Sequence, residues 1–149
     1  MLSFYFFLVG LFLTDYLTKF WAVRHLKNRP PVSLIKNFIN LDYVENHGAA
    51  FGILQNQKFF LAAVTIITLI IFAHNFFSLA DSKIDNAIRF SIVLIFSGAL
   101  GNFINRIVNG YVIDFIEFAF VDFPVFNLAD IFLCCGFAMF AIINFFVKN

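Results

Sequence analysis

Four long apolar stretches constrain the fold of this chain more than any other feature of its sequence. They cover residues 2–23, 59–77, 87–107 and 128–147. Each is long enough to cross a bilayer, which takes about 20 predominantly apolar residues. A soluble domain of 149 residues with 62% hydrophobic side chains has too little interior to bury them. We therefore predict a mainly α membrane protein, with residues 1–149 forming a single bundle of four transmembrane helices.

Composition and motifs argue against several classes of function. The formal net charge of +1 gives no electrostatic reason to expect a nucleic-acid partner. The three histidines lack metal-ligand spacing, and the signatures of serine hydrolases, zinc peptidases and phosphate-binding loops are missing. Cys134 and Cys135 are adjacent in an apolar run, where we expect small packing residues rather than a disulfide. We expect neither a metal nor a cofactor.

The segments around the apolar stretches carry their own patterns. The first stretch has no basic n-region and no small-residue cleavage site, so we predict a retained span rather than a secretory signal peptide. The loop at residues 28–56 begins with a proline-rich turn and then alternates apolar and polar residues from Ile39 to Tyr43. This pattern predicts one or two short strands on the membrane surface. The loop before the fourth stretch is aromatic and only partly alternating, and we expect it to follow the interface.

Ionisable residues inside a span cost about 2.5–3.5 kcal/mol each on insertion scales and usually face the interior of a bundle. Asp15 and Lys19 are four residues apart, so they can pair on one helix face. The pair either orients the first helix or acts directly in a site. Asn102, Asn105 and Arg106 form a polar stripe at the end of the third stretch. Alternatively, Arg106 extends to the interface with the asparagines as its hydrogen-bond partners.

Two further aspartates flank the start of the fourth stretch. Asp130 can occupy the third position of a helix capped by Asn127, where a carboxylate stabilises free N–H groups, and Asp114 can be an exposed loop charge. Their shared position beside the polar stripe instead suggests a joint role. Two carboxylates in close contact share one proton near neutral pH. The ionised one can then deprotonate water while the protonated one donates to a carbonyl oxygen, which amounts to amide hydrolysis by an aspartic dyad.

Four segments of the chain resemble bacterial lipoprotein signal peptidases, the signal peptidase II family. They are DYLTK at 15–19, ENHGAAFGIL at 45–54, GALGNFINRIVNGYVIDFI at 98–116 and FPVFNLADIF at 123–132. The resemblance implies four transmembrane helices with cytoplasmic termini. It also implies a small extracytoplasmic β-cradle in the first loop, with a surface helix or strand over the site.

The resemblance also implies an activity, partners and a location. The expected activity is that of a membrane aspartic endopeptidase, which removes the signal peptide of a diacylglyceryl-modified prolipoprotein by cutting before the lipidated cysteine. The expected partners are this lipidated substrate and the phospholipid bilayer. The enzyme would be a monomer in the bacterial cytoplasmic membrane, with its active site toward the extracytoplasmic side.

By motif, the resemblance assigns the catalytic roles to Asp114 and Asp130. The residues expected to bind substrate or support the site are Asn46, Gly48, Asn102, Asn105, Arg106, Asn127, Asp15 and Lys19. One position departs from the family, which usually has aspartate where this chain has Asn105. Asparagine keeps the size and an acceptor oxygen but loses the charge that could pair with Arg106. The alternative function, a non-catalytic transport accessory or inactive relative, rests on this one residue.

The charge pattern and the resemblance disagree about orientation. The first loop and its borders carry five basic residues, namely Arg24, Lys27, Arg29, Lys36 and Lys58. The positive-inside rule would place them in the cytoplasm. We follow the resemblance and expect this loop outside, because its basic residues can meet lipid phosphates of the outer leaflet.

Overall fold

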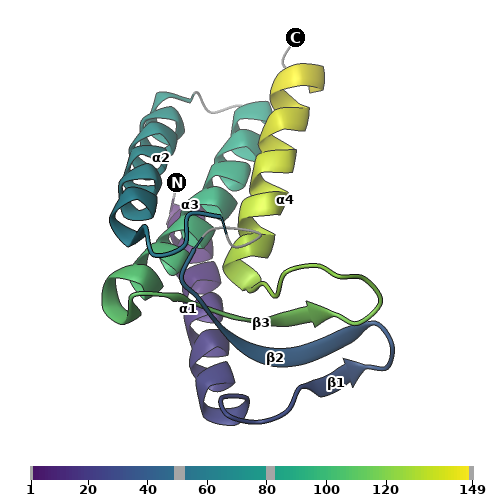
Figure 1. The fold of residues 1–149 in the computed structure, drawn as a ribbon. Coiled ribbons are helices and arrows are strands. Elements are labelled where there is room, and N and C mark those ends of the chain that lie inside the picture. Colours follow the sequence, from purple (N-terminus) through teal and green to yellow (C-terminus); the bar gives the residue numbers. More distant parts are fainter. Residues whose placement is uncertain (1, 49–52, 80–82, 148–149) are drawn as a thin grey trace.

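The four apolar stretches form four helices that are long and apolar enough to cross a membrane (Figure 1). The computed structural model describes residues 2–48, 53–79 and 83–147. Within these residues the helical elements are α1 (Leu2–His25), α2 (Lys58–Ser78), α3 (Lys83–Asn109), α4 (Leu128–Ile142) and a π-helical turn (Ile143–Val147) that continues α4. The prediction of a mainly α membrane protein with four spanning helices is confirmed.

The helix α3 lies at the centre of the bundle. In the most apolar 18-residue segment of α3, 61% is buried inside the protein. The corresponding buried shares are 17% in α1, 11% in α2 and 17% in α4, so these three helices are largely exposed. Two glycines of α3 let its neighbours approach closely. A Cβ atom at Gly98 would collide with the carbonyl of Ala129 in α4, and one at Gly101 with the carboxylate of Asp15 in α1.

A three-stranded antiparallel sheet crosses the end of the bundle at which α3 finishes and α4 begins (Figure 1). Its strands are β1 (Val32–Ile35), β2 (Ile39–Asn46) and β3 (Val112–Phe118), in that spatial order. The sequence predicts one or two short strands in the first loop, and the loop forms two. The third is not predicted by the sequence pattern, because the segment after α3 alternates only in part. It becomes a strand by pairing with β2, with Val44 opposite Asp114 and Asn46 opposite Val112.

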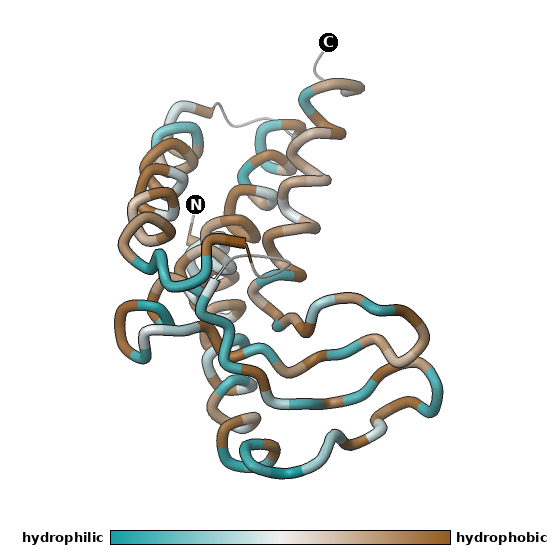
Figure 2. Tube along the Cα trace, viewed as in Figure 1, coloured by the Kyte–Doolittle hydropathy of each residue, from teal (hydrophilic) through white to brown (hydrophobic). Residues whose placement is uncertain are grey.

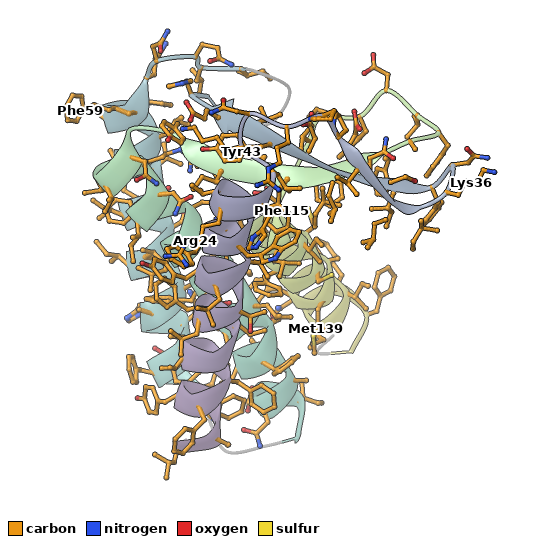
Figure 3. The ribbon with its side chains drawn as sticks, turned by 90° about the horizontal axis from the view of Figure 1, so that it is seen from below. Arg24, Lys36, Tyr43, Phe59, Phe115 and Met139 are labelled. Carbon is orange, nitrogen blue, oxygen red and sulfur yellow. The ribbon has the colours of Figure 1, made fainter. Side chains whose placement is uncertain are left out.

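The sheet is attached to the bundle mainly through α1. Ile113 and Phe115 of β3 pack against Ala22 and against Leu26, which directly follows α1, and Figure 3 shows Phe115 between the sheet and this helix. Away from α1 the sheet projects past the start of α4 (Figure 1). The helices are mostly hydrophobic along their length, whereas the sheet alternates between hydrophilic and hydrophobic residues (Figure 2). The strand β3 packs on the bundle, and β2 and then β1 lie beyond it in the sheet. Asp114 is therefore held between the bundle and the rest of the sheet.

Candidate active site

Asp130 is oriented by the cap of α4. The side chain of Asn127 accepts a hydrogen bond from the Asp130 N–H at 3.1 Å, and the Asp130 Oδ2 atom accepts one from the Asn127 N–H at 3.1 Å. This reciprocal capping box satisfies two N–H groups that a helix start would otherwise leave unpaired. The local expectation of Asn127 as the cap, with Asp130 in the third position, is confirmed. One carboxylate is thereby fixed at the positive end of the helix dipole.

Asp114 lies in β3 and is only 2% exposed, so the interpretation as an exposed loop charge is wrong. Burial is possible because two side-chain amides satisfy the carboxylate. Asn127 Nδ2 donates to Asp114 Oδ1 at 2.6 Å, and Asn46 Nδ2 at the end of β2 donates to Oδ2 at 2.9 Å. Asn127 therefore bonds to both Asp114 and Asp130, and it links strand and helix through one side chain.

Asn102 in α3 completes the link between the two carboxylates. Its Oδ1 atom accepts hydrogen bonds from Lys19 Nζ at 2.8 Å and from Asn127 Nδ2 at 3.2 Å. With the carbonyl side of the amide occupied in this way, the Nδ2 side faces Asp130 and donates to its Oδ1 atom at 2.8 Å. Lys19 and Asn127 together set the orientation of the Asn102 amide, and hence its contact with Asp130.

The Asp15–Lys19 pair is formed as the sequence predicts, and it is almost fully buried. Lys19 Nζ lies 2.8 Å from Asp15 Oδ2, and the other carboxylate oxygen accepts a hydrogen bond from the Ala129 N–H at 3.0 Å. The sequence left open whether the pair orients α1 or acts in a site. The structure shows that it contacts both α3, through Asn102, and the first turn of α4, so it joins three helices around the carboxylates.

Arg106 and Asn105 each contact backbone rather than each other. Arg106 Nη2 donates to the carbonyl of Gly48 at 3.0 Å, and the Gly48 N–H donates to Asn46 Oδ1 at 2.9 Å. Asn105 Oδ1 accepts from the N–H of Ile113 at 3.2 Å. What the structure uses at this position is an acceptor oxygen, which asparagine supplies as well as aspartate does. Residues 49–52 of the resembling motif lie outside the described part of the chain.

The electrostatic surroundings of Asp114 favour its protonated form. Burial raises the pKa of Asp114, the nearby Asp130 carboxylate raises it further, and together they bring it to about 6. The hydrogen bonds from Asn46 and Asn127 and the charge of Lys19 lower this pKa and offset the increase only in part. The two carboxyl groups are thus close enough for the ionisation of one to oppose that of the other.

A cavity of about 390 Å³ holds both carboxylates. It is bounded by the sheet, the end of α3, the segment before α4 and one side of α4. Its lining includes Asn46, Asn102, Arg106, Asp114, Phe118, Phe126, Asp130, Ile131, Cys134 and Cys135. The two cysteines are free and exposed. Within the described residues, no group of three or more histidine, cysteine, aspartate or glutamate side chains is arranged to hold a metal ion.

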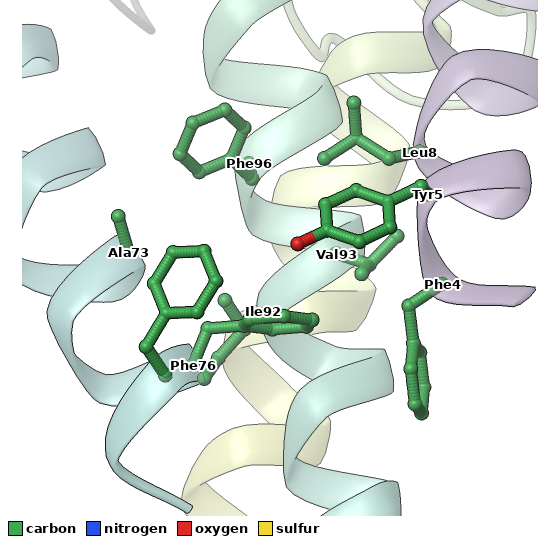
Figure 4. Close-up of a pocket in the computed structure, with 9 residues that line it drawn as sticks. Phe4, Tyr5, Leu8, Ala73, Phe76, Ile92, Val93 and Phe96 are labelled. Carbon is green, nitrogen blue, oxygen red and sulfur yellow. The ribbon is translucent and has the colours of Figure 1, made fainter. Parts of the chain in front are cut away.

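A second cavity, of about 280 Å³, lies between α1, α2 and α3, and no residue of the sheet lines it (Figure 4). Figure 4 shows aromatic rings and aliphatic side chains around it, with Phe76 and Phe96 on one side and Tyr5 and Leu8 on the other. Its lining has no carboxyl, amide or basic side chain. It cannot support proton transfer of the kind that the first cavity allows, and the first cavity is therefore the candidate active site.

The fold is that of a protein with four helices apolar enough to span a membrane, and one cavity is lined by both Asp114 and Asp130. Two solved structures described as a bacterial membrane enzyme, determined by the in meso method at 2.3 Å and 1.9 Å resolution, have the same fold. The first has a TM-score of 0.87 and 34% identity, over 97% of this chain and 87% of that one. The second has a TM-score of 0.86 and 33% identity, over 99% and 95%.

Sequence comparison identifies the family. The family model described as signal peptidase (SPase) II matches residues 7–146. The lipoprotein signal peptidase of Clostridium tetani is 38% identical over 82% of this chain and 79% of its own length. That of Caldanaerobacter subterraneus is 41% identical over 82% and 81%. The chain belongs to the signal peptidase II family and is a peptidase.

Proposed function

We propose that this chain is a lipoprotein signal peptidase of the bacterial cytoplasmic membrane. It removes the signal peptide from diacylglyceryl-modified prolipoproteins by cutting before the lipidated cysteine. Its family and the names of its relatives support this substrate class. The observation that carries the mechanism is the set of hydrogen bonds from Asn127 to both Asp114 and Asp130, because it brings carboxylates from a strand and a helix into one cavity.

In the proposed reaction the two carboxyl groups together hold one proton. Asp114 carries it, because burial and the Asp130 charge raise the pKa of Asp114. Asp130 is the base and takes a proton from water as the hydroxyl oxygen bonds to the scissile carbonyl carbon. Asp114 gives its proton to the carbonyl oxygen. The C–N bond then breaks as the intermediate collapses: the leaving nitrogen takes the proton that Asp130 accepted from water, and Asp114 takes back the proton of the gem-diol hydroxyl as the carboxylic acid product forms.

The charges of the site balance when the dyad holds a single proton. Lys19 and Arg106 contribute two positive charges, and Asp15 and the singly protonated Asp114–Asp130 pair contribute two negative ones. Asp15, Lys19 and Asp114 are buried whereas Arg106 and Asp130 are half-buried, and a cluster without net charge avoids much of the desolvation penalty of an unpaired ion. Removing Lys19 would take away a charge that lowers the pKa of Asp114, so Asp114 would hold its proton more tightly.

The cavity also supports a route for the substrate. Ile131, Cys134 and Cys135 line it from a spanning helix and are exposed, so a signal peptide that lies in the bilayer can reach the dyad laterally. Asn46 at the end of β2 would bind the substrate backbone. The cut lies at the extracytoplasmic side, both termini lie in the cytoplasm, and the enzyme acts as a monomer.

The substrate class is tested by cleavage in purified form. The protein in detergent is incubated with a precursor peptide that carries the diacylglyceryl group and with the same peptide without it, and the products are identified by mass spectrometry. We expect cleavage of the lipidated peptide only, at the bond before the modified cysteine. Equal cleavage of both peptides would refute the proposed substrate class, and a cut at another bond would refute the proposed position.

The orientation is tested by labelling in cells. In a variant that lacks Cys134 and Cys135, the change Lys36→Cys places one thiol in the turn between β1 and β2. We expect a membrane-impermeant thiol reagent to modify it in intact spheroplasts. Labelling that appears only after the membrane is permeabilised would place the sheet in the cytoplasm.

A further inference from the structure

Five phenylalanines form a continuous cluster of rings toward the end of the sheet that projects from the bundle. This aromatic ridge consists of Phe38, Phe118, Phe120, Phe123 and Phe126. The Phe118 ring is its centre, with centroids of Phe126 at 5.1 Å, Phe120 at 5.5 Å and Phe123 at 5.7 Å. Phe38 stacks on Phe120 at 5.2 Å with the ring planes 6° apart. The ridge thus joins the turn between β1 and β2 to the segment before α4.

Backbone hydrogen bonds hold the segments that carry the ridge. The N–H of Ala119 donates to the carbonyl of Phe38 at 3.0 Å, just beyond the last residue of β3. Further along, Phe126 pairs with Ile116 in an antiparallel bridge, with hydrogen bonds of 2.8 and 2.9 Å. The rings therefore sit on paired backbone at both ends of the segment, and the ridge is a preformed surface.

The outer part of the ridge is uncovered. Phe120 is 59% exposed, Phe38 48% and Phe123 42%, and Val121, which follows Phe120 in the chain, is 49% exposed. A contiguous apolar surface of this kind is unfavourable in water, and on a folded protein it usually marks a contact with a partner or a membrane.

The position of the ridge identifies what covers it. Phe118, Phe123 and Phe126 line the same cavity as Ile131 and Cys134, which belong to a helix that spans the membrane. The ridge is therefore continuous with a lipid-facing surface and begins where α4 enters the bilayer. The spanning helices already hold the sheet at this boundary, so lipid reaches the exposed rings without a second protein.

Two charged side chains limit how deep the ridge can lie. Lys36 is at the far end of the sheet (Figure 3), Asp122 lies between Val121 and Phe123 in the chain, and both are exposed. These charges must stay hydrated, because a charge in the hydrocarbon region is costly. The rings can therefore reach the headgroup layer and the first methylenes, a depth typical of interfacial aromatic residues, with Lys36 at the level of lipid phosphates.

We propose that the aromatic ridge is a membrane contact separate from the four spanning helices, and that its outer rings insert into the interfacial layer of the leaflet on the dyad side. The contact prevents the free end of the sheet from lifting away from the bilayer and so fixes the depth of the cavity. The inference concerns the position of the sheet in the membrane and does not depend on the proposed peptidase activity.

Tryptophan fluorescence tests this position directly, since Trp21 is the chain's single tryptophan. The double variant Trp21→Phe, Phe120→Trp is reconstituted into vesicles with and without phospholipids that carry bromine near the top of the acyl chain. We expect blue-shifted emission that loses most of its intensity in the brominated vesicles and resists aqueous iodide. Phe38→Trp in the same background should behave alike and guards against a local effect of one substitution.

The matched control is Arg29→Trp in the same background, which places the probe in the exposed turn that directly follows α1. We expect red-shifted emission that iodide quenches and bromine does not. Two results would overturn the proposal. Quenching of the ridge probes by iodide rather than bromine would show that the ridge lies in water. Protection from both quenchers would show that protein, such as a second copy of the chain, covers it.

Discussion

The two ends of the helix bundle bury different kinds of side chain. At the end crossed by the sheet, Asp15, Lys19, Asn102 and Asn127 are each at most 5% exposed and all take part in side-chain hydrogen bonds. At the opposite end the core is apolar, and its buried residues are Phe76, Ile88, Ile92, Val93 and Ile143. Both ends belong to the same four helices, so the difference comes from the sequence at each end and not from the architecture.

One buried cation at the apolar end makes the contrast clearer. Arg89 is 4% exposed, and it donates to the carbonyls of Phe76 and Leu79 and to Asn86 Oδ1. The two carbonyls belong to the end of α2, where backbone acceptors lack helical partners and a positive charge is favourable. The polar group there completes a helix. At the end crossed by the sheet, Asn102 and Asn127 donate hydrogen bonds to Asp130 and Asp114. Polar groups are buried there to position two carboxylates rather than to complete a helix.

The largest expected difference between the two ends is the loss of cleavage rate when Asp114 or Asp130 is replaced. Asp114→Asn and Asp130→Asn are each expected to lower the cleavage rate by about 10³-fold or more, because each removes one partner of the proton transfer, while the helices remain folded. Cleavage of a lipidated precursor and circular dichroism measure the two properties. Asp85→Asn at the opposite end makes the same chemical change and should cleave at nearly the wild-type rate. Wild-type activity in either dyad variant would end the dyad hypothesis.

Asn127 allows capping to be separated from positioning. Asn127→Ser keeps an oxygen that can cap α4 but loses the amide that donates to Asp114, whereas Asn127→Ala loses both. We expect both variants to cleave about 10²-fold more slowly, since small misplacements of reacting groups cost that much. The alanine variant should be about 1 kcal/mol less stable than the serine variant, because it alone loses the cap of α4. If the serine variant were fully active, the bond from Asn127 to Asp114 would have no positioning role.

Lys19 tests the ion pair that joins α1 to the site. Lys19→Met leaves Asp15 buried without a counter-ion, and breaking such a pair typically costs about 3–5 kcal/mol. Thermal unfolding in detergent should show this loss, and the double variant Asp15→Asn, Lys19→Met should recover much of it. Cleavage should stay slow in the double variant, because Asn102 loses the shorter of the two hydrogen bonds that orient its amide and keeps only the one from Asn127. Full recovery of activity would make the pair purely structural.

Replacing Asn105 is expected to have a smaller effect, which appears in the dependence of the cleavage rate on pH. Cleavage is expected to fall as pH rises through the pKa of Asp114, about 6, because the dyad then loses the proton that it donates. Asn105→Asp keeps the acceptor for Ile113 and adds a negative charge, which raises the pKa of Asp114 and should move this fall on the order of one unit to higher pH.

The other charges that act on Asp114 are Asp130 from α4, Lys19 from α1 and Arg106 from α3, and all of them remain in this variant. Asn105→Ala, which removes the acceptor without adding a charge, should lower the rate without moving the profile. An unchanged profile in the aspartate variant would show that position 105 has no electrostatic influence on the dyad.

Features that depend on local pattern were predictable from the sequence. The apolar stretches give the spans to within a few residues, the i, i+4 spacing gives the Asp15–Lys19 pair, and Asn127 followed by Asp130 gives the cap of α4. Each involves residues close together in the chain, where helix geometry fixes which side chains meet. The shared position of Asp114 and Asp130 beside the polar stripe suggests a joint role, and the resemblance to the family assigns them the catalytic roles.

Contacts between distant parts of the chain were not predictable in this way. The strand β3 forms only by pairing with β2, about 70 positions earlier, and the sequence of its own segment gives only a weak alternation. The bond from Lys19 to Asn102 and the bond from Arg106 to the Gly48 carbonyl also join remote elements. In the sequence, the residues of each of these bonds are far apart and give no sign that they meet. The partner of a buried polar group depends on tertiary packing, which periodicity does not encode.

The most direct measurement is the titration of the Asp114 carboxyl carbon by NMR, in protein labelled at aspartate side chains and assigned with Asp114→Asn. We expect a midpoint near the pKa of about 6 in the wild-type protein. In Asp130→Asn the midpoint should move toward lower pH, because the neighbouring negative charge is gone, and burial should keep it above the ordinary value. The same midpoint in both proteins would show that the two carboxyl groups do not sense each other.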